Sequence, residues 1–290
     1  MHEQSDQLHF DVALDRLRGG DLHGGISILA DALGVEGASA FAGPLLRRHP
    51  LHSFLLKDPL TERGFTKPRG YAGDAMLFDM IYDRLPPVGT QPPGTGLFSI
   101  TCEMPMAEAV RHRLLQAKEV LEREWRAGKR ICALACGHWR EADGLVGRDL
   151  SNIVAVDCDA LALERIWQFH EGRASLCDVS AQAYLRRAAS EGETFDYIYS
   201  LGLANRIADP DLASLVQAMR ACLSPGGTIM VSALASDQRT AGWMDAVMDW
   251  RFVVRGASDL QRIATDLGLR SRVRRDPSGL LAWCEMEELQ

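Results

Sequence analysis

Apolar residues in the C-terminal half of the chain fall into short runs that are separated by segments with helical spacing. The runs at 131–136, 153–156 and 195–201 are too brief for helices and are typical of strands buried on both faces. The segments at 160–169 and 211–222 place their apolar residues three or four positions apart, as an amphipathic helix does. This alternation predicts an α/β fold with a mostly parallel, doubly wound sheet.

The same pattern continues to the end of the chain. Further strands are expected at 174–177 and 228–233, the second after a tight Leu-Ser-Pro-Gly-Gly turn at 223–227. Residues 269–274 and 280–286 alternate as the two arms of a closing hairpin. The sheet should therefore have seven strands and end in an antiparallel hairpin.

The first part of the chain is different, because residues 1–125 are mostly helical and contain no clear strand. A segment at 45–56 is broken by its His49-Pro50 pair, and a long helix is expected at 104–125. We expect a helical region at 1–125 that caps the sheet domain at 126–290. Its apolar stripes serve as core or as a partner-helix face, which leaves room for a homodimer through this region.

Two loops interrupt the helical region. Lys67-Pro-Arg-Gly-Tyr-Ala-Gly-Asp74 combines turn residues with two cations and an aromatic ring, which suits a loop that presents side chains. Asp74 could cap the helix that follows, and the alternative for the loop is a plain surface turn with this N-cap. Residues 85–97, with four Pro and three Gly, are expected to form an irregular connection.

Composition excludes several classes of protein. The chain has 290 residues, 47% of them hydrophobic, and a formal net charge of −7, which disfavours a nucleic-acid binder. No apolar run reaches the roughly 18 residues of a membrane span, and no secretory segment opens the chain, so a cytoplasmic protein away from membranes is expected. The seven cysteines form no C-x-x-C pair; we expect reduced thiols and no metal site.

The candidate site begins where the first predicted strand ends. Gly137 allows a sharp turn there, and Asp157 ends the next strand twenty residues later. Strand, Gly turn, helix, strand and acid is the arrangement of a nucleotide-ribose site, in which the Asp157 carboxylate accepts hydrogen bonds from both ribose hydroxyls. Asp178, at the end of the third strand, is placed to meet an adenine amino group beside the Val179 amide.

With these features, residues 128–234 resemble a class I S-adenosylmethionine-dependent methyltransferase, with Ala135-Cys136-Gly137 as its first motif and Asp157 as its second. The resemblance implies a Rossmann-like fold and S-adenosylmethionine as cofactor. It also implies that the first motif lies against the methionine part, and that Ser200-Leu201-Gly202 borders the sulfonium and the acceptor. The cofactor-binding residues expected on this basis are Arg69, Tyr71, Ala135, Cys136, Gly137, Arg140, Glu141, Asp157, Cys158, Asp178, Val179, Ser200, Leu201 and Gly202.

The resemblance narrows to one bacterial subgroup, many of whose members are labelled as making 3-hydroxypalmitic acid methyl ester, an extracellular signal. It rests on the segments 67–74, 135–142, 196–203 and 242–250 and runs from about residue 48 to the end. The chain departs from that subgroup after strand four and around Phe252-Val-Val-Arg255. Since both places should border the acceptor, the acceptor stays open.

The remaining roles are predicted from where each residue is expected to lie. Arg69 and Tyr71 suit the cofactor carboxylate, whereas Arg140 and Glu141 either pair with each other or hold the amino acid end of the cofactor. Tyr71 and His138 are the catalytic candidates, although His138 also suits a loop-shaping role. A carboxylate acceptor would need no base, but an amine or hydroxyl would. Candidate contacts to a small-molecule acceptor are Asn205, Arg206, Trp250 and Arg255.

Two other functions stay open from the sequence. The enzyme could use S-adenosylmethionine itself as substrate, as in an intramolecular cyclisation that releases methylthioadenosine. It could also be a cofactor-binding accessory protein without catalysis.

Overall fold

The computed structural model describes residues 2–35, 37–235 and 237–289, and the chain divides into two compact units. A helical unit comprises residues 1–110 and 236–252, and a sheet unit comprises residues 111–235 and 253–290. The sequence had placed one boundary near residue 125. In the structure the division falls inside a continuous helix, and the chain returns to the helical unit between strand five and the last helix.

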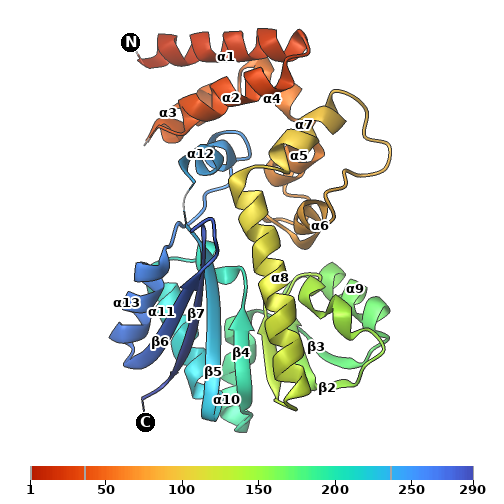
Figure 1. The fold of residues 1–290 in the computed structure, drawn as a ribbon, viewed down its shortest axis with the longest axis vertical. Helices are drawn as coiled ribbons and strands as arrows, with labels where there is room; N and C mark the ends of the chain where they lie inside the picture. Colours follow the sequence, from red (N-terminus) through yellow and green to blue (C-terminus); the bar gives the residue numbers. More distant parts are fainter. Residues whose placement is uncertain (1, 36, 236, 290) are drawn as a thin grey trace. The chain divides into compact units, whose positions relative to one another are not determined.

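The sheet unit contains seven strands in the order β3-β2-β1-β4-β5-β7-β6 (Figure 1). The first five strands pair in parallel, and β7 runs antiparallel between β5 and β6. This confirms the predicted Rossmann-like sheet with its closing hairpin. The strands are β1 (Ile131–Leu134), β2 (Leu150–Asp157), β3 (Ala174–Asp178), β4 (Phe195–Ser200), β5 (Leu223–Leu234), β6 (Leu269–Arg275) and β7 (Leu281–Glu288).

Both faces of the sheet are covered, because alternate residues of each buried strand point to opposite cores. In β1, Cys132 and Leu134 face one apolar cluster, and Ile131 and Ala133 face the other. The first cluster is completed by α10 (Ala181–Glu191), α11 (Asp209–Ala221) and α13 (Ala257–Asp266). The second is completed by α8 (Pro105–Arg126), α9 (Ala160–His170) and the 3₁₀ turn η1 (Arg140–Leu145).

Two helices of the helical unit begin at aspartate caps. Asp58 caps α5 through the amides of Leu60 and Thr61, and Asp74 caps α6 through the amide of Leu77, as the sequence predicted for Asp74. Its helices are α1 (His2–Arg18), α2 (Leu22–Leu33), α3 (Ala38–Leu46), α4 (Pro50–Leu55), α5 (Pro59–Thr66), α6 (Ala75–Asp83), α7 (Gly94–Thr101) and α12 (Gln238–Ala246).

Two local predictions were wrong, and a helix was missed. Residues 94–101 form α7, although their Gly and Pro content predicted an irregular segment through 97. The turn expected at 223–227 is part of β5: Phe195 pairs with Leu223 and Tyr197 with Thr228, so the intervening residues of β5 bulge out of register. Helix α10 had not been predicted. No helix in the described part of the chain is long and apolar enough to cross a membrane.

Candidate functional site

The register of the parallel strands brings the four predicted cofactor segments to one edge of the sheet. Leu134 lies opposite Val156, and Asp157 lies opposite Asp178, so the loops after β1, β2 and β3 leave the sheet together. Ala133 lies opposite Tyr199 on the other side of β1. Strands β1 and β4 are also where the strand order reverses, the usual ligand site of an open α/β sheet.

The loop after β1 has an unusual backbone. Ala135, Gly137 and Trp139 have φ values of 52°, 57° and 52°, in the left-handed region that residues with a Cβ rarely adopt. Non-glycine residues in this region hold about 1–3 kcal/mol of strain each and cluster at functional sites. These three residues turn the chain at the carboxyl end of β1, where the first motif was predicted.

Asp157 is fixed by the main chain around it. The Gly137 amide donates to its Oδ2 at 2.7 Å, and the Asp159 amide donates to its Oδ1 at 2.9 Å. The residue is 8% exposed. A carboxylate has about four acceptor positions, so two amide donors leave capacity for two hydroxyl donors.

The neighbouring candidates are more accessible. Cys158 and Asp178 are exposed, and Val179 is half-buried with its amide bonded to the Asp157 carbonyl at 3.1 Å. That bond uses the amide predicted to meet adenine, which leaves the Asp178 side chain and the Val179 side chain as the accessible groups of this segment.

A buried polar chain lies beneath the β1 loop. The Trp139 indole donates to the Tyr199 hydroxyl at 2.8 Å, and that hydroxyl donates to Glu141 Oε1 at 2.9 Å. Burial raises the pKa of Glu141 to about 7, although the Tyr199 hydrogen bond and the Arg113 charge oppose the rise. No role was predicted for Tyr199, because its alternate position on β4 is typical of ordinary core.

Arg140 and His138 lie in the same loop. The Arg140 guanidinium pairs with Asp143 Oδ2 at 2.9 Å, one helical turn along η1. His138 is buried, at 6% exposed. The sequence left open whether Arg140 and Glu141 pair with each other or hold the amino acid end of the cofactor. In the structure Arg140 pairs with Asp143, and Glu141 accepts from Tyr199. A role toward a cofactor stays a prediction for both.

The loop after β4 is held by two donors that the sequence analysis missed. Arg113 Nη1 donates to the Leu201 carbonyl at 2.7 Å, and Ser232 Oγ donates to the same oxygen at 2.8 Å. Arg113 is buried. It lies one turn before Ala117 on the apolar stripe of α8, and a cation at such a position could have been noticed in the sequence. The neighbouring Ser200 Oγ is buried without a hydrogen-bond partner among the described residues.

Two predicted acceptor contacts are occupied by the main chain. The Asn205 amide nitrogen donates to the Leu234 and Val253 carbonyls, at 2.9 and 2.8 Å, so both of its hydrogens are used. Arg255 is 1% exposed and binds Asp209 at 2.6 Å and two carbonyls of the same loop. These bonds give both side chains a positioning role, and the Arg206 side chain is exposed.

In the helical unit, two of the predicted motifs come together. Lys67 Nζ donates to the Asp249 carbonyl at 2.8 Å, and a Cβ on Gly73 would lie 2.3 Å from the Trp250 ring. The loop 67–74 therefore packs against the 249–250 segment. Arg69 and Tyr71 lie half-exposed on this loop.

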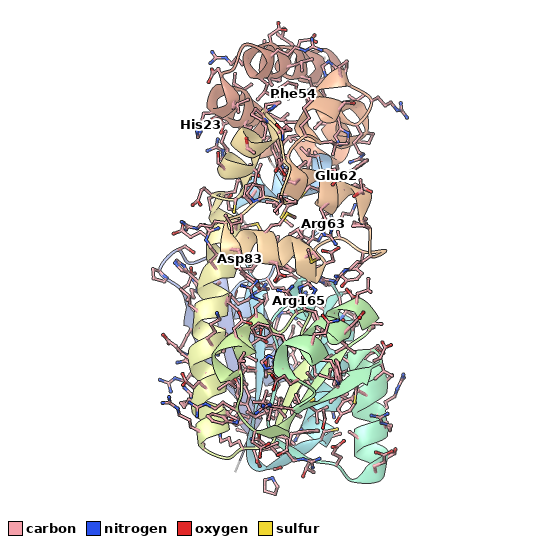
Figure 2. The ribbon with its side chains drawn as sticks, turned by 90° about the vertical axis from the view of Figure 1, so that its right-hand side faces the viewer. His23, Phe54, Glu62, Arg63, Asp83 and Arg165 are labelled. Atoms are coloured by element: carbon pink, nitrogen blue, oxygen red, sulfur yellow. The ribbon has the colours of Figure 1, made fainter. Side chains whose placement is uncertain are left out.

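Asp74 has two roles in the same unit. It caps α6, and its buried carboxylate takes both bonds of a fork from Arg63, at 2.7 Å each (Figure 2 labels Arg63). The Arg63 pair ties α5 to the start of α6 and so fixes both ends of the loop that carries Arg69 and Tyr71.

Comparisons with known proteins identify the family. The model of a methyltransferase domain matches residues 106–271, more than half of the chain. A solved structure of a possible exported protein from Bordetella parapertussis is 18% identical and aligns over 75% of this chain and 80% of its own, with a TM-score of 0.59. Magnesium protoporphyrin IX methyltransferase from Synechocystis PCC 6803, with bound S-adenosylmethionine, is 11% identical over 64% of this chain and 85% of its own, with a TM-score of 0.45. A comparison with curated proteins gives no match. The chain belongs to the methyltransferase domain family.

Proposed function

We propose that this enzyme methylates a small-molecule acceptor at the carboxyl edge of β1 and β4. The observation that carries the proposal is the Asp157 carboxylate, which two main-chain amides hold in place while part of its acceptor capacity stays open. Together with the left-handed backbone at Ala135 and Trp139, it forms a preshaped site at the strand-order reversal.

The residues present fit S-adenosylmethionine. Asp157 would hold the ribose hydroxyls, Asp178 and Val179 would border adenine, and the 135–137 backbone would lie beside the methionine part. The buried Ser200 Oγ, without a partner in the described structure, offers a further polar contact at the end of β4. The cofactor supplies an activated methyl group on a sulfonium.

The protein's own contribution is alignment and exclusion of water. Arg113 and Ser232 fix the Leu201 carbonyl, and Asn205 and Arg255 fix the loop that follows. Positioning of this kind is the main requirement of an in-line displacement. If the acceptor is an amine or hydroxyl, His138 or Tyr71 is our candidate for removing its proton.

The proposal also concerns which class of small molecule accepts the methyl group. The motif likeness at 67–74 and 242–250 to a subgroup labelled for a fatty-acid methyl ester supports a small molecule. The departures at Ala204–Ile207 and Phe252–Arg255 change the segments expected to border it, so a different acid, amine or alcohol is our preferred substrate.

The experiment is incubation of the full-length protein with S-adenosylmethionine, alone and with pooled small carboxylic acids, amines and alcohols, followed by mass spectrometry. We expect S-adenosylhomocysteine to form only when an acceptor is present. The product should then be heavier than the acceptor by one CH₂, about 14 Da. Methylthioadenosine formed without acceptor would contradict methyl transfer and favour cyclisation. Binding without any turnover would favour an accessory protein.

A further inference from the structure

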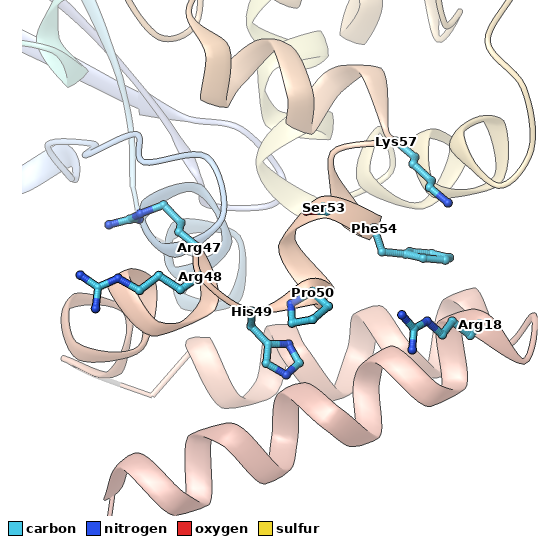
Figure 3. A pocket seen from close by; sticks show the side chains of 8 residues that line it. All are labelled: Arg18, Arg47, Arg48, His49, Pro50, Ser53, Phe54 and Lys57. Carbon is cyan, nitrogen blue, oxygen red and sulfur yellow. The ribbon is translucent and has the colours of Figure 1, made fainter.

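A basic pocket lies in the helical unit, outside the site described above. It has a volume of about 640 Å³ and is lined by Arg18, Arg47, Arg48, His49, Pro50, Ser53, Phe54 and Lys57 (Figure 3). Five of these eight residues carry or can carry positive charge, and none is acidic. In a chain of formal net charge −7, this concentration of cations is unusual.

Two of the basic groups already have partners. Arg47 donates to the Ala246 carbonyl at 2.9 Å and lies 3.7 Å from Asp249, and His49 lies 3.2 Å from Asp11. These contacts hold the walls of the pocket in place, and we assign neither residue to a ligand.

The other three cations are available. The guanidinium groups of Arg18 and Arg48 make no hydrogen bond or ion pair within the described part of the chain, and both side chains are exposed. Lys57 Nζ lies 4.6 Å from the centre of the Phe54 ring, a cation–π contact without a carboxylate. Arg18 and Lys57 lie on either side of Phe54 at one end of the pocket, whereas the Arg48 side chain points away from them (Figure 3). Arg18 and Lys57 repel each other, and an anion bound between them would relieve that repulsion.

The arrangement favours a phosphoryl group on a small molecule. Guanidinium groups bind phosphate oxygens through two parallel hydrogen bonds, and a phosphate ester brings more negative charge than one carboxylate. The volume lies in the range of small-ligand sites, about 300–1,000 Å³. Figure 3 shows Phe54 at the same end of the pocket as Arg18 and Lys57, so the apolar ring borders the charged end.

We propose that this pocket binds a phosphorylated small molecule, with its phosphoryl groups on Arg18 and Lys57 and its organic part against Phe54. Such a site would lie in the helical unit and act separately from the cofactor edge of the sheet. Nucleic acid is a poorer fit, because Arg18 and Lys57 at one end of a pocket form no extended basic stripe.

The test is calorimetry on the full-length protein with two probes, inorganic tripolyphosphate and UTP. Saturation with S-adenosylhomocysteine occupies the cofactor site, and UTP has no adenine that could compete there. We expect both probes to bind, and the double variant Arg18→Ala/Lys57→Ala to weaken both by about tenfold or more. The control Arg16→Ala/Arg84→Ala removes two cations of the same unit that pair with Asp21 and Glu103 outside the pocket, and should leave binding unchanged.

Phe54→Ala tests the second half of the proposal. It should weaken UTP several-fold, on the order of one stacked or apolar contact, and leave tripolyphosphate unaffected. Binding of neither probe, or equal binding to the pocket and control variants, would overturn the proposal. Circular dichroism of each variant establishes that it is folded, and the tripolyphosphate result does not depend on whether the cofactor assignment is correct.

Discussion

The main-chain amide of Gly137 donates to the Asp157 carboxylate at 2.7 Å and so joins two motifs that lie 20 residues apart. The bond sets the loop after β1 against the end of β2, while the Asp159 amide fixes the second carboxylate oxygen. Asp157 thus fixes the geometry of the loop after β1, and its role toward a ribose is our proposal. Loss of its carboxylate should therefore disturb both the ligand contact and the loop.

The Tyr199 hydroxyl should stabilise the sheet unit, because it satisfies the buried Trp139 indole and Glu141 carboxyl at once. Tyr199→Phe leaves both without this partner and should lower the free energy of unfolding by about 1–3 kcal/mol. Urea unfolding measures the loss. The matched variant Tyr184→Phe removes a hydroxyl that bonds only to a partly exposed Glu193, and should lose less. Equal losses of unfolding free energy would show that the Tyr199 hydrogen bonds to Trp139 and Glu141 stabilise the protein no more than the single bond of Tyr184.

Glu141 should make stability depend on pH. Its carboxyl loses a proton near pH 4.5 when unfolded but at about 7 when folded. Between these values the folded state binds more protons, so stability is greatest at the acidic end and falls as the pH rises to 7. The difference corresponds to about 3 kcal/mol. Urea unfolding at pH 5 and pH 8 should show a smaller decline for Glu141→Gln than for the unaltered protein. The same decline in both proteins would show that a group other than Glu141 causes the pH dependence.

Arg113 and Ser232 should act together, since they donate to one oxygen, the Leu201 carbonyl. Arg113→Met should accelerate amide hydrogen exchange in the loop after β4 and weaken S-adenosylhomocysteine binding by about 1 kcal/mol. Ser232→Ala should do the same to a lesser degree, and the double variant should depart from additivity. Arg126→Met, on the exposed end of the same helix, is the control. Additive effects, or an unchanged loop in Arg113→Met, would contradict a shared role.

Gly73 should be intolerant of a side chain. Its φ is 68°, and a Cβ would lie 2.3 Å from the Trp250 ring. Gly70 is a matched control on the same loop, because its φ is 84° but a Cβ there would meet nothing within 4 Å. Gly70→Ala should lose only the backbone term of about 1–2 kcal/mol, and Gly73→Ala should lose more. Thermal unfolding compares them. If both variants unfold alike, the 67–74 loop does not pack on Trp250 as described.

The sequence could predict the sheet because its central strands are short apolar runs bounded by turn residues and its last two strands alternate as a hairpin does. The Asp157 and Asp178 positions followed from where those runs ended. Periodicity could not predict the return of residues 236–252 to the helical unit, since the partner of an amphipathic helix is decided by tertiary packing. It also missed α7, whose Gly-rich start looked like a loop.

Candidate site residues could be chosen from the sequence only by their position. Asp157 was chosen because it ends a strand, and its role toward a cofactor stays a prediction. Asn205 and Arg255 were chosen as ligand contacts because burial cannot be read from a loop sequence. Their donors are used by main-chain carbonyls. The roles of Arg69, Tyr71 and Arg206 toward ligands stay predictions, as do a cytoplasmic location and a homodimer.

The central claim is that the carboxyl edge of β1 and β2 binds the cofactor through Asp157. Calorimetric titration of S-adenosylhomocysteine into Asp157→Ala tests it most directly, with Asp149→Ala as a control on the loop before β2. We expect Asp157→Ala to weaken binding by about 1–3 kcal/mol, the loss of charge-assisted hydrogen bonds to the ribose, and the control to bind normally. Unaltered affinity in a folded Asp157→Ala protein would show that the cofactor binds elsewhere.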